Sequence, residues 1–342
     1  MYFRFYSNKG VVLCSNLPTE LLEECKNCTV EYERKQCSVR NIIKRHGKKE
    51  FPDGYVYLCY YENNITSKIF NRHLKMSELQ FPYFLESYKE LQQKEQQTIR
   101  RLKHNIVTYN SNITQELYAL ISQDTLSRKN AKEQIATISN YISKNPKETT
   151  AAFIRILKNS NLINSEFNVF DLLVTENISE LDFDSHSIHK VILLSLQPYW
   201  LDFQELEVNI NIGACKEKVH IDYSSISVAL CHIFNNATKY ISINSLLDIS
   251  FSETSDYINI TFSMLSLHVE KYEENKIFEE SYSGIWANKA CLQGNGIGMF
   301  YVKKLVELNK GKVAFIPGDE INFQLKGIPY SRNKILIQLP KD

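Results

Sequence analysis

Two segments carry the residue types that phosphate and metal chemistry use. The first is Cys231-His-Ile-Phe-Asn-Asn-Ala-Thr-Lys-Tyr240, which gathers imidazole, amide, amine and phenol groups within one short stretch. The second is Gly294-Asn-Gly-Ile-Gly-Met299, which leads into a helical sequence, Phe300-Tyr-Val-Lys-Lys-Leu-Val-Glu-Leu308. Glycines let backbone amides approach phosphates, and the amino-terminal end of the following helix favours negative charge. The glycine triplet alone is a weak signal, because it also fits a tight turn before an amphipathic helix.

A histidine further upstream is a candidate nucleophile. His104 lies in Arg100-Arg-Leu-Lys-His-Asn-Ile-Val-Thr108, two residues from both Leu102 and Ile106. Those two residues belong to an apolar stripe with a spacing of three or four, so His104 is expected to point away from the stripe. The plain alternative is a solvated basic face of a helix.

The positions of glycine and proline in the sequence predict the helices and strands that must hold these residues. No glycine lies between Gly54 and Gly213, which predicts a mostly helical region. A long helix is expected from Phe84 to Ile121 and a second from Ser127 to Ser143, ended by Pro146. Two such antiparallel helices from each of two chains would form a four-helix bundle. The apolar stripe of the first helix comprises Ile99, Leu102, Ile106, Tyr109, Ile113, Leu117 and Leu120, and the second helix carries Ile135, Ile138 and Ile142 on one face.

The two ends of the chain have a mixed pattern. Residues 1–80 contain a strand-like Val56–Tyr61 and a helix-like Thr19–Glu24, which predicts a small α+β module. Residues 150–205 are expected to be helical, with a loop near Asp182–Ser187. After Gly213 the sequence predicts a mixed sheet with helices on one face. Strands are expected at 207–212, 247–251, 257–262, 312–316 and 335–339, and helices at 222–240, with Asp222 as the N-cap, and at 297–309.

Composition excludes several classes of protein. The 342 residues hold 40 Lys+Arg and 39 Asp+Glu, so no overall field would attract nucleic acid or an anionic membrane. No apolar stretch approaches the roughly 20 residues of a membrane span, and the N-terminus lacks a signal-peptide core. We therefore expect a cytoplasmic protein with no nucleic-acid partner and no membrane. Four of the eight cysteines, Cys14, Cys25, Cys28 and Cys37, could bind zinc, but their spacing is not one of the strong paired patterns and favours small buried apolar side chains.

Taken together, the two chemical segments resemble the ATP-binding domain of sensor histidine kinases. Asn236 and Gly294 lie 58 residues apart, in the order of that family's N-box and second glycine box. Ile277-Phe278 resembles the family's phenylalanine box, and Gly311-Lys-Val-Ala-Phe315 resembles the strand that follows its last helix. The similarity covers roughly residues 180–340. It implies an α/β sandwich of the histidine-kinase ATPase (Bergerat) type after a central helical hairpin, within an overall α+β chain.

The resemblance implies a role for each matched residue. Asn236 would ligate Mg²⁺, and His104-Asn105 with Thr108 resembles the family's H-box, which makes His104 the phosphoacceptor. Thr108 would help a hydrolytic water on the partner protein. The residues implied to bind the cofactors ATP and Mg²⁺ are His232, Asn236, Lys239, Tyr240, Phe278, Gly294, Gly296 and Gly298.

Two departures from the kinase pattern and one difference from the related hydrolases are visible. The residue after the acceptor is Asn105, where the family has an acidic group that can take a proton. The first glycine box is absent near Ser263–His268, so the aspartate that would recognise the adenine amino group is missing. Gyrase and mismatch-repair ATPases, which share the fold, carry a glutamate four residues before the Mg²⁺ asparagine, and here that residue is His232.

The resemblance leads to one expected function and two alternatives. The expected function is a dimeric histidine kinase that autophosphorylates His104 and passes the phosphoryl group to a separate response-regulator-like receiver protein. One alternative is a pseudokinase that acts as a dimeric nucleotide- or signal-sensing scaffold. The other is an ATP-gated hydrolase, which the absent glutamate disfavours. The expected domains are a sensory or regulatory α+β module (1–82), a dimerisation and phosphotransfer region (83–175) and an ATP-binding catalytic domain (176–342).

Overall fold

The chain divides into two units with separate cores. A computed structural model describes residues 1–22, 25, 33–36, 43–60, 65–127, 130–173, 181–292 and 294–342. Contacts separate an N-terminal unit, Met1–Arg101, from a C-terminal unit, Leu102–Asp342. The domain boundary expected near residue 175 lies outside the described residues.

The N-terminal unit is a five-stranded antiparallel sheet covered on one face by a helix. The strand order is β2-β1-β5-β4-β3, and buried residues alternate along β5 as expected for a sheet with one covered face. The first part of α2 packs Phe70, Leu74 and Phe81 against this face. The strand predicted at 56–61 is confirmed over 56–60, and the short helix predicted at 19–24 is confirmed over 19–22; the remaining positions of both lie outside the described residues. The elements are β1 (Tyr2–Ser7), β2 (Val12–Ser15), α1 (Thr19–Leu22), β3 (Glu33–Gln36), β4 (Ile43–Phe51), β5 (Gly54–Tyr60) and α2 (Ser67–Leu120).

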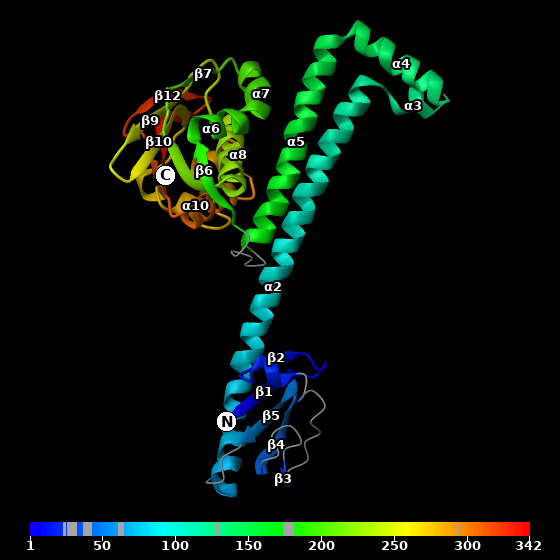
Figure 1. Cartoon of the computed structure of the whole chain (residues 1–342), viewed down its shortest axis with the longest axis vertical. Helices are drawn as coiled ribbons and strands as arrows, with labels where there is room; N and C mark the ends of the chain where they lie inside the picture. Colours follow the sequence, from blue (N-terminus) through cyan, green and yellow to red (C-terminus); the bar gives the residue numbers. More distant parts are fainter. Residues whose placement is uncertain are drawn as a thin grey trace. The chain divides into compact units, whose positions relative to one another are not determined.

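The helical hairpin of the C-terminal unit pairs different segments from those predicted. The end of α2 packs antiparallel to α5 (Pro146–Leu173), while α3 (Gln123–Ser127) and α4 (Ala131–Lys144) form the connection (Figure 1). The expected partner at 127–143 was therefore wrong. Pro146 is the first residue of α5 and does not merely end α4. Proline is tolerated there because the N–H group that it lacks would have no hydrogen-bond partner in the first turn of a helix.

Polar pairs set the register of this hairpin. Asn105 Nδ2 donates to Glu166 Oε1 at 2.9 Å, Asn112 Nδ2 to Asn159 Oδ1 at 3.2 Å, and Arg155 Nη1 to Glu116 Oε2 at 3.3 Å. The spacings of seven and four residues on α2 recur in reverse on α5, as in antiparallel helices that share a seam.

The sheet of the C-terminal unit has the predicted mixed character. Its strand order is β11-β13-β10-β9-β7, with β12 paired to β13. β7 pairs parallel to β9, and the remaining pairs are antiparallel. All five predicted strands are confirmed. The strands are β7 (Asn209–Ile212), β9 (Leu246–Glu253), β10 (Tyr257–Leu267), β11 (Lys312–Ile316), β12 (Ile321–Leu325) and β13 (Ile328–Pro340).

A second, two-stranded sheet corrects the predicted loop near 182–187. β6 (Phe183–Ser187) pairs antiparallel with β8 (Lys218–Asp222), whose backbone supplies the hydrogen-bond partners. Because that partner is distant in sequence, local composition gives no sign of the pairing.

Helices α6, α8 and α10 cover one face of the larger sheet and share its core (Figure 1). The predicted N-cap is confirmed, since Asp222 Oδ1 accepts from the Ser225 amide at 2.7 Å. Asn309, just after α10, accepts from the Asp222 amide at 2.8 Å and donates to Ser225 Oγ at 2.7 Å. The end of α10 is thereby fastened to the start of α8. These helical elements are α6 (Ile188–Leu196), η2 (Gln197–Tyr199), α7 (Trp200–Glu205), α8 (Tyr223–Tyr240), η3 (Lys271–Glu273), η4 (Lys276–Phe278), α9 (Ile285–Lys289) and α10 (Gly298–Leu308).

The architecture confirms the α+β fold class, with an antiparallel module, a helical hairpin and an α/β layer structure. Within the described ranges, no helix has both the length and the apolar composition required to cross a membrane.

Candidate functional site

A cavity of about 460 Å³ in the C-terminal unit gathers most of the predicted site residues. Its walls come from α8, from the end of β10, from the segment before α10, and from α2 and α5. Phe278 is the predicted residue that does not line it. The predicted residues that do are His104, Asn105, Thr108, His232, Asn236, Lys239, Tyr240, Gly294, Gly296 and Gly298.

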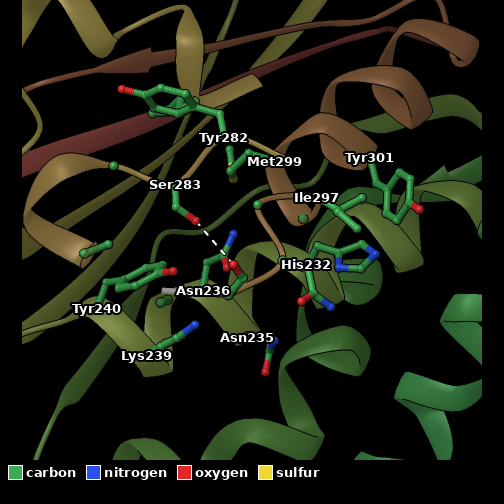
Figure 2. Close-up of a pocket in the computed structure, with 18 of the residues that line it drawn as sticks. His232, Asn235, Asn236, Lys239, Tyr240, Tyr282, Ser283, Ile297, Met299 and Tyr301 are labelled. Atoms are coloured by element: carbon green, nitrogen blue, oxygen red, sulfur yellow. Dashed lines mark hydrogen bonds between the residues drawn. The ribbon is translucent and has the colours of Figure 1, made fainter. Parts of the chain in front are cut away.

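Helix α8 presents its chemical groups on one face. Asn236 lies four residues after His232, and Lys239 and Tyr240 lie three and four residues after Asn236. These spacings bring the four side chains to the same side of a helix. Figure 2 shows these side chains along the cavity, with Asn235 beside them. The face opposite carries buried apolar residues that hold α8 against the sheet. The sequence pattern therefore both places the helix and aims its polar groups.

The segment Gly294–Gly298, here called the glycine loop, runs close to these side chains. An added Cβ at Gly298 would lie 3.3 Å from Asn236 Nδ2, and one at Gly294 would lie 3.0 Å from Lys239 Nζ. Gly296 has a φ of +64°, and a Cβ there would lie 2.5 Å from the Tyr282 carbonyl oxygen. Only glycine allows this backbone path.

A buried glutamate organises the segment that faces the loop. Glu273 is fully buried, and its Oε1 accepts from the Tyr282 hydroxyl at 2.7 Å and from the Ile285 amide at 3.0 Å. Ser283 Oγ donates to the Gly294 carbonyl at 3.3 Å, the dashed line in Figure 2. Burial and the Glu273 hydrogen bond raise the pKa of Tyr282. Sequence reasoning missed Glu273, because the motif comparison carried no signal for it.

His232 is held neutral. Its ring is buried next to Tyr301, with ring centroids 5.6 Å apart. Within the described part of the chain, its Nε2 has no hydrogen-bond partner. Burial lowers the pKa of His232 to about 4, so the imidazole is uncharged at neutral pH.

Lys239 and Tyr240 lie at the edge of the glycine loop. Burial lowers the pKa of Lys239 and raises the pKa of Tyr240. The Lys239 ammonium lies 5.2 Å from the centroid of the Tyr240 ring, a cation–π distance. The amine thus stays close to the loop, where it can face an anion.

Phe278 is placed differently from the other predicted residues. It is buried in η4, and the Lys303 ammonium of α10 lies 6.0 Å from its ring centroid. Its neighbour Ile277 lines the cavity instead. Phe278 therefore contributes through packing against α10 and does not face the cavity.

The part of the cavity wall that β10, β11 and β13 form, here called the base end, is mainly apolar, although Ser266 and His268 also line it. Met264 and Leu267 of β10 and Phe315 and Ile335 of the neighbouring strands line it. In this cavity, Glu166 is the one carboxylate that the described residues contribute, and it does not come from the 263–268 segment. The missing aspartate thus has no acidic substitute at this end.

Asn333 lies opposite Met264 in the strand register, but its amide is already used. Its Nδ2 donates to Ser266 Oγ at 2.9 Å and to the Leu267 carbonyl at 2.8 Å. Its Oδ1 accepts from Ser331 Oγ and from the Gly318 amide, both at 3.0 Å. These four bonds exhaust the two donors and two lone pairs of the amide.

The histidine-bearing end of α2 forms the mouth of the cavity. His104 is exposed as predicted, and Thr108 Oγ1 donates to its carbonyl at 2.9 Å. Asn105 contacts two residues that the sequence did not single out. Its Nδ2 donates to Glu166 Oε1, and its Oδ1 accepts from Asn295 Nδ2 of the glycine loop, each at 2.9 Å. Candidate acceptor and glycine loop therefore border one cavity.

The zinc alternative finds no support among the described residues. Within them, no group of three or more His, Cys, Asp or Glu side chains could hold a metal ion. Cys28 and Cys37 lie outside the described residues.

Comparison with known proteins agrees with the motifs. No family model matches the chain. Histidine protein kinase SaeS of Staphylococcus aureus (strain USA300) is 21% identical over 164 residues, which are 46% of this chain and 47% of SaeS. The chain thus spans about half the length of the curated relatives it matches.

Solved structures of two histidine kinases were also found. The mycobacterial sensor histidine kinase MprB is 16% identical with a TM-score of 0.38, covering 47% of this chain and 98% of its own. Histidine kinase ThkA, solved in complex with the response regulator protein TrrA, is 12% identical with a TM-score of 0.43, covering 100% and 96%. By its motifs and by the sequence similarity to SaeS, the chain is related to the histidine protein kinases.

Proposed function

We propose that this protein is a histidine kinase that binds ATP with Mg²⁺ in the cavity and phosphorylates its own His104. The observation that carries the proposal is the common lining of the cavity, which includes His104, the glycine loop and Asn236. A donor site and an acceptor on the same cavity supply the proximity that phosphoryl transfer requires.

The residues at the glycine loop fit a magnesium-bound triphosphate. Gly298 leaves room beside the Asn236 amide, whose carbonyl oxygen is a ligand type that Mg²⁺ accepts together with phosphate oxygens. The N-terminus of α10 and the Lys239 ammonium face the same space and favour negative charge. Asn236 would hold the ion, and bound Mg²⁺ would neutralise phosphate charge.

The proposed reaction needs little from the protein except position. A ring nitrogen of His104 attacks the γ-phosphorus, an N–P bond forms, the bond to the bridging oxygen breaks, and ADP leaves. The phosphoryl group then passes to a carboxylate of a separate receiver protein. Thr108 of this chain would help a water molecule to hydrolyse the phosphorylated receiver. The cytoplasmic location and the receiver partner stay predictions.

A second copy of the chain is the proposed partner of the hairpin. Val107, Leu117, Phe153 and Leu157 are exposed large apolar residues on α2 and α5. Apolar residues left exposed on a helical pair favour association into a four-helix bundle. We therefore propose a homodimer.

The test is incubation of the purified protein with Mg²⁺ and γ-labelled ATP. Wild type is expected to take up acid-labile, base-stable label, and His104→Ala is expected to take up none. Asn236→Ala should lower Mg²⁺-dependent nucleotide affinity by about tenfold or more, since one metal ligand is lost. His220→Ala is a matched control, because His220 is an exposed histidine of β8 outside the cavity. Label on His104→Ala equal to wild type would refute the assignment of the acceptor.

A pseudokinase is the second candidate, and the apolar base end is the observation that favours it. Its signature would be nucleotide binding in a calorimetric titration with no label on wild type. In that case His104→Ala should also leave the biological output unchanged.

A further inference from the structure

We propose that Glu166 is the positioning residue of the acceptor site, and that it acts through Asn105 to fasten the glycine loop to helix α2. The inference rests on the proposed kinase function for its consequence, phosphoryl transfer to His104. Its structural content concerns three side chains from three elements, α2, α5 and the glycine loop.

The three side chains form a continuous hydrogen-bonded chain. Asn295 Nδ2 donates to Asn105 Oδ1 at 2.9 Å, and Asn105 Nδ2 donates to Glu166 Oε1 at 2.9 Å. Glu166 is 7% exposed, whereas Asn295 is exposed on the loop. The chain therefore runs from a buried anchor on α5 to the surface of the loop.

The contact with the Glu166 carboxylate fixes which way the Asn105 amide faces. A carboxylate only accepts hydrogen bonds, so Asn105 must turn its Nδ2 toward Glu166. Its Oδ1 is then the group that faces the loop, where it meets the Nδ2 of Asn295. Without Glu166, both orientations of the amide would be open, and one of them would present a donor to another donor.

This arrangement explains why position 105 is an amide rather than an acid. An aspartate there would bring a second carboxylate to within hydrogen-bond distance of Glu166, a like-charge pair at a buried site. In this chain, the acidic group near the acceptor is Glu166 of α5 instead of a residue at position 105. Burial raises the pKa of Glu166, and the Asn105 hydrogen bond opposes that shift.

Helix α2 carries the candidate acceptor and the positioning contact to α5 on two adjacent faces. His104 and Thr108 are four residues apart, and so are Asn105 and Tyr109. Tyr109 is close enough to Glu166 for the carboxylate to raise its pKa, in addition to the larger effect of burial. Asn105 and Tyr109 thus occupy the face turned to α5, next to the face that carries His104 and Thr108, and all four residues line the cavity.

The decisive experiment exchanges the amide and the acid. Asn105→Asp should place two carboxylates together, release the loop and lower labelling of His104 by about tenfold. Glu166→Gln alone should lower labelling about threefold, because an amide at 166 can turn either its donor or its acceptor toward Asn105 and no longer fixes the orientation of that side chain. The double variant Asn105→Asp/Glu166→Gln should recover most of the lost labelling. In it, the new amide on α5 can donate to the new carboxylate on α2, and that carboxylate can still accept from Asn295.

Hydrogen exchange of the peptide covering 294–300 reads the contact without any phosphorylation. In nucleotide-free protein, Asn105→Asp is expected to speed its exchange about tenfold, and the double variant is expected to restore it. Asn112→Asp is the matched control, because Asn112 donates to Asn159 across the same two helices but does not line the cavity. It should leave exchange of the loop unchanged.

The outcomes separate the proposal from the function on which it rests. Exchange that rises in Asn105→Asp and recovers in the double variant supports the contact even if wild type takes up no label, a result that would refute only the kinase. Labelled wild type with unchanged exchange in Asn105→Asp would overturn the role of Glu166. Equal effects of Asn105→Asp and Asn112→Asp would also overturn it, because the loss would then belong to the helix pair in general.

Discussion

The two ends of the cavity differ in how they could recognise a ligand. At the phosphate end, formed by Asn236, Lys239 and the glycine loop, one amide and one amine face backbone that only glycine can form. At the base end, Met264, Leu267, Phe315 and Ile335 offer apolar surface, and the nearby Asn333 amide is fully bonded within the protein. One end can pair with charge, whereas the other offers mainly apolar surface.

For the proposed nucleotide site, this contrast predicts that the binding energy comes mainly from contacts with the phosphates and the metal rather than from contacts with the base. A site that hydrogen-bonds a ligand group rejects analogues without it strongly, whereas an apolar surface discriminates weakly. We therefore expect a nucleotide site with normal phosphate requirements and low selectivity between purines.

The largest effect should come from breaking the phosphate end at Gly296. Gly296→Ala forces a side chain into a left-handed backbone position with the Tyr282 carbonyl oxygen only 2.5 Å from the new Cβ. The loop must move, and nucleotide affinity should fall by about 100-fold or more. Calorimetric titration with a non-hydrolysable ATP analogue measures the change.

Gly327→Ala controls for backbone conformation alone. Gly327 has a φ of +78°, and nothing lies within 4 Å of a Cβ there, so it carries the strain without the clash. Its affinity should match wild type. Equal losses in the two variants would mean that general destabilisation, and not the loop, accounts for the result.

A smaller effect should come from restoring a carboxylate at the base end. Met264→Asp adds a carboxylate to the cavity wall, which can accept from the amino group of adenine and repels the oxo group of guanine. The ratio of ATP to GTP affinity is expected to rise from near one to about ten. Competition titrations with the two nucleotides give this ratio directly.

Met264→Leu keeps the base end apolar and should keep the ratio near one. A wild-type preference for ATP as strong as that of the aspartate variant would show that the base is read by other groups, and the contrast between the two ends would fail.

The sequence predicted the phosphate end better than the acceptor side, and the reason is locality. An N-cap at Asp222, a polar face on α8 and glycines before α10 are signals within a few residues, and the structure places them as expected. The strands of the β9–β10 hairpin were equally readable, because their alternation is local.

The features that the sequence did not predict depend on contacts between residues that are distant along the chain. Glu166 reads as one polar residue of a helix, and its value appears only when α5 lies antiparallel to α2 and brings it to Asn105. The pairing of β6 with β8, and of α2 with α5 rather than with 127–143, has the same origin. Pattern and capping specify elements, but the choice among possible partners is a property of the packed unit.

The smallest expected effect concerns His232, whose buried ring lines the cavity. Its pKa of about 4 lies below the ordinary value of 6.5, so folding favours the neutral ring. That contribution is complete above pH 6.5 and is lost as the pH falls toward 4. Stability of the C-terminal unit should therefore drop by about 1 kcal/mol more between pH 7.5 and pH 5.5 in wild type than in His232→Gln. Urea unfolding followed by tryptophan fluorescence measures this, because both tryptophans, Trp200 and Trp286, belong to that unit. Identical pH profiles would show that the imidazole is hydrated, and His232 would then be available to contact a ligand instead of serving as a neutral wall.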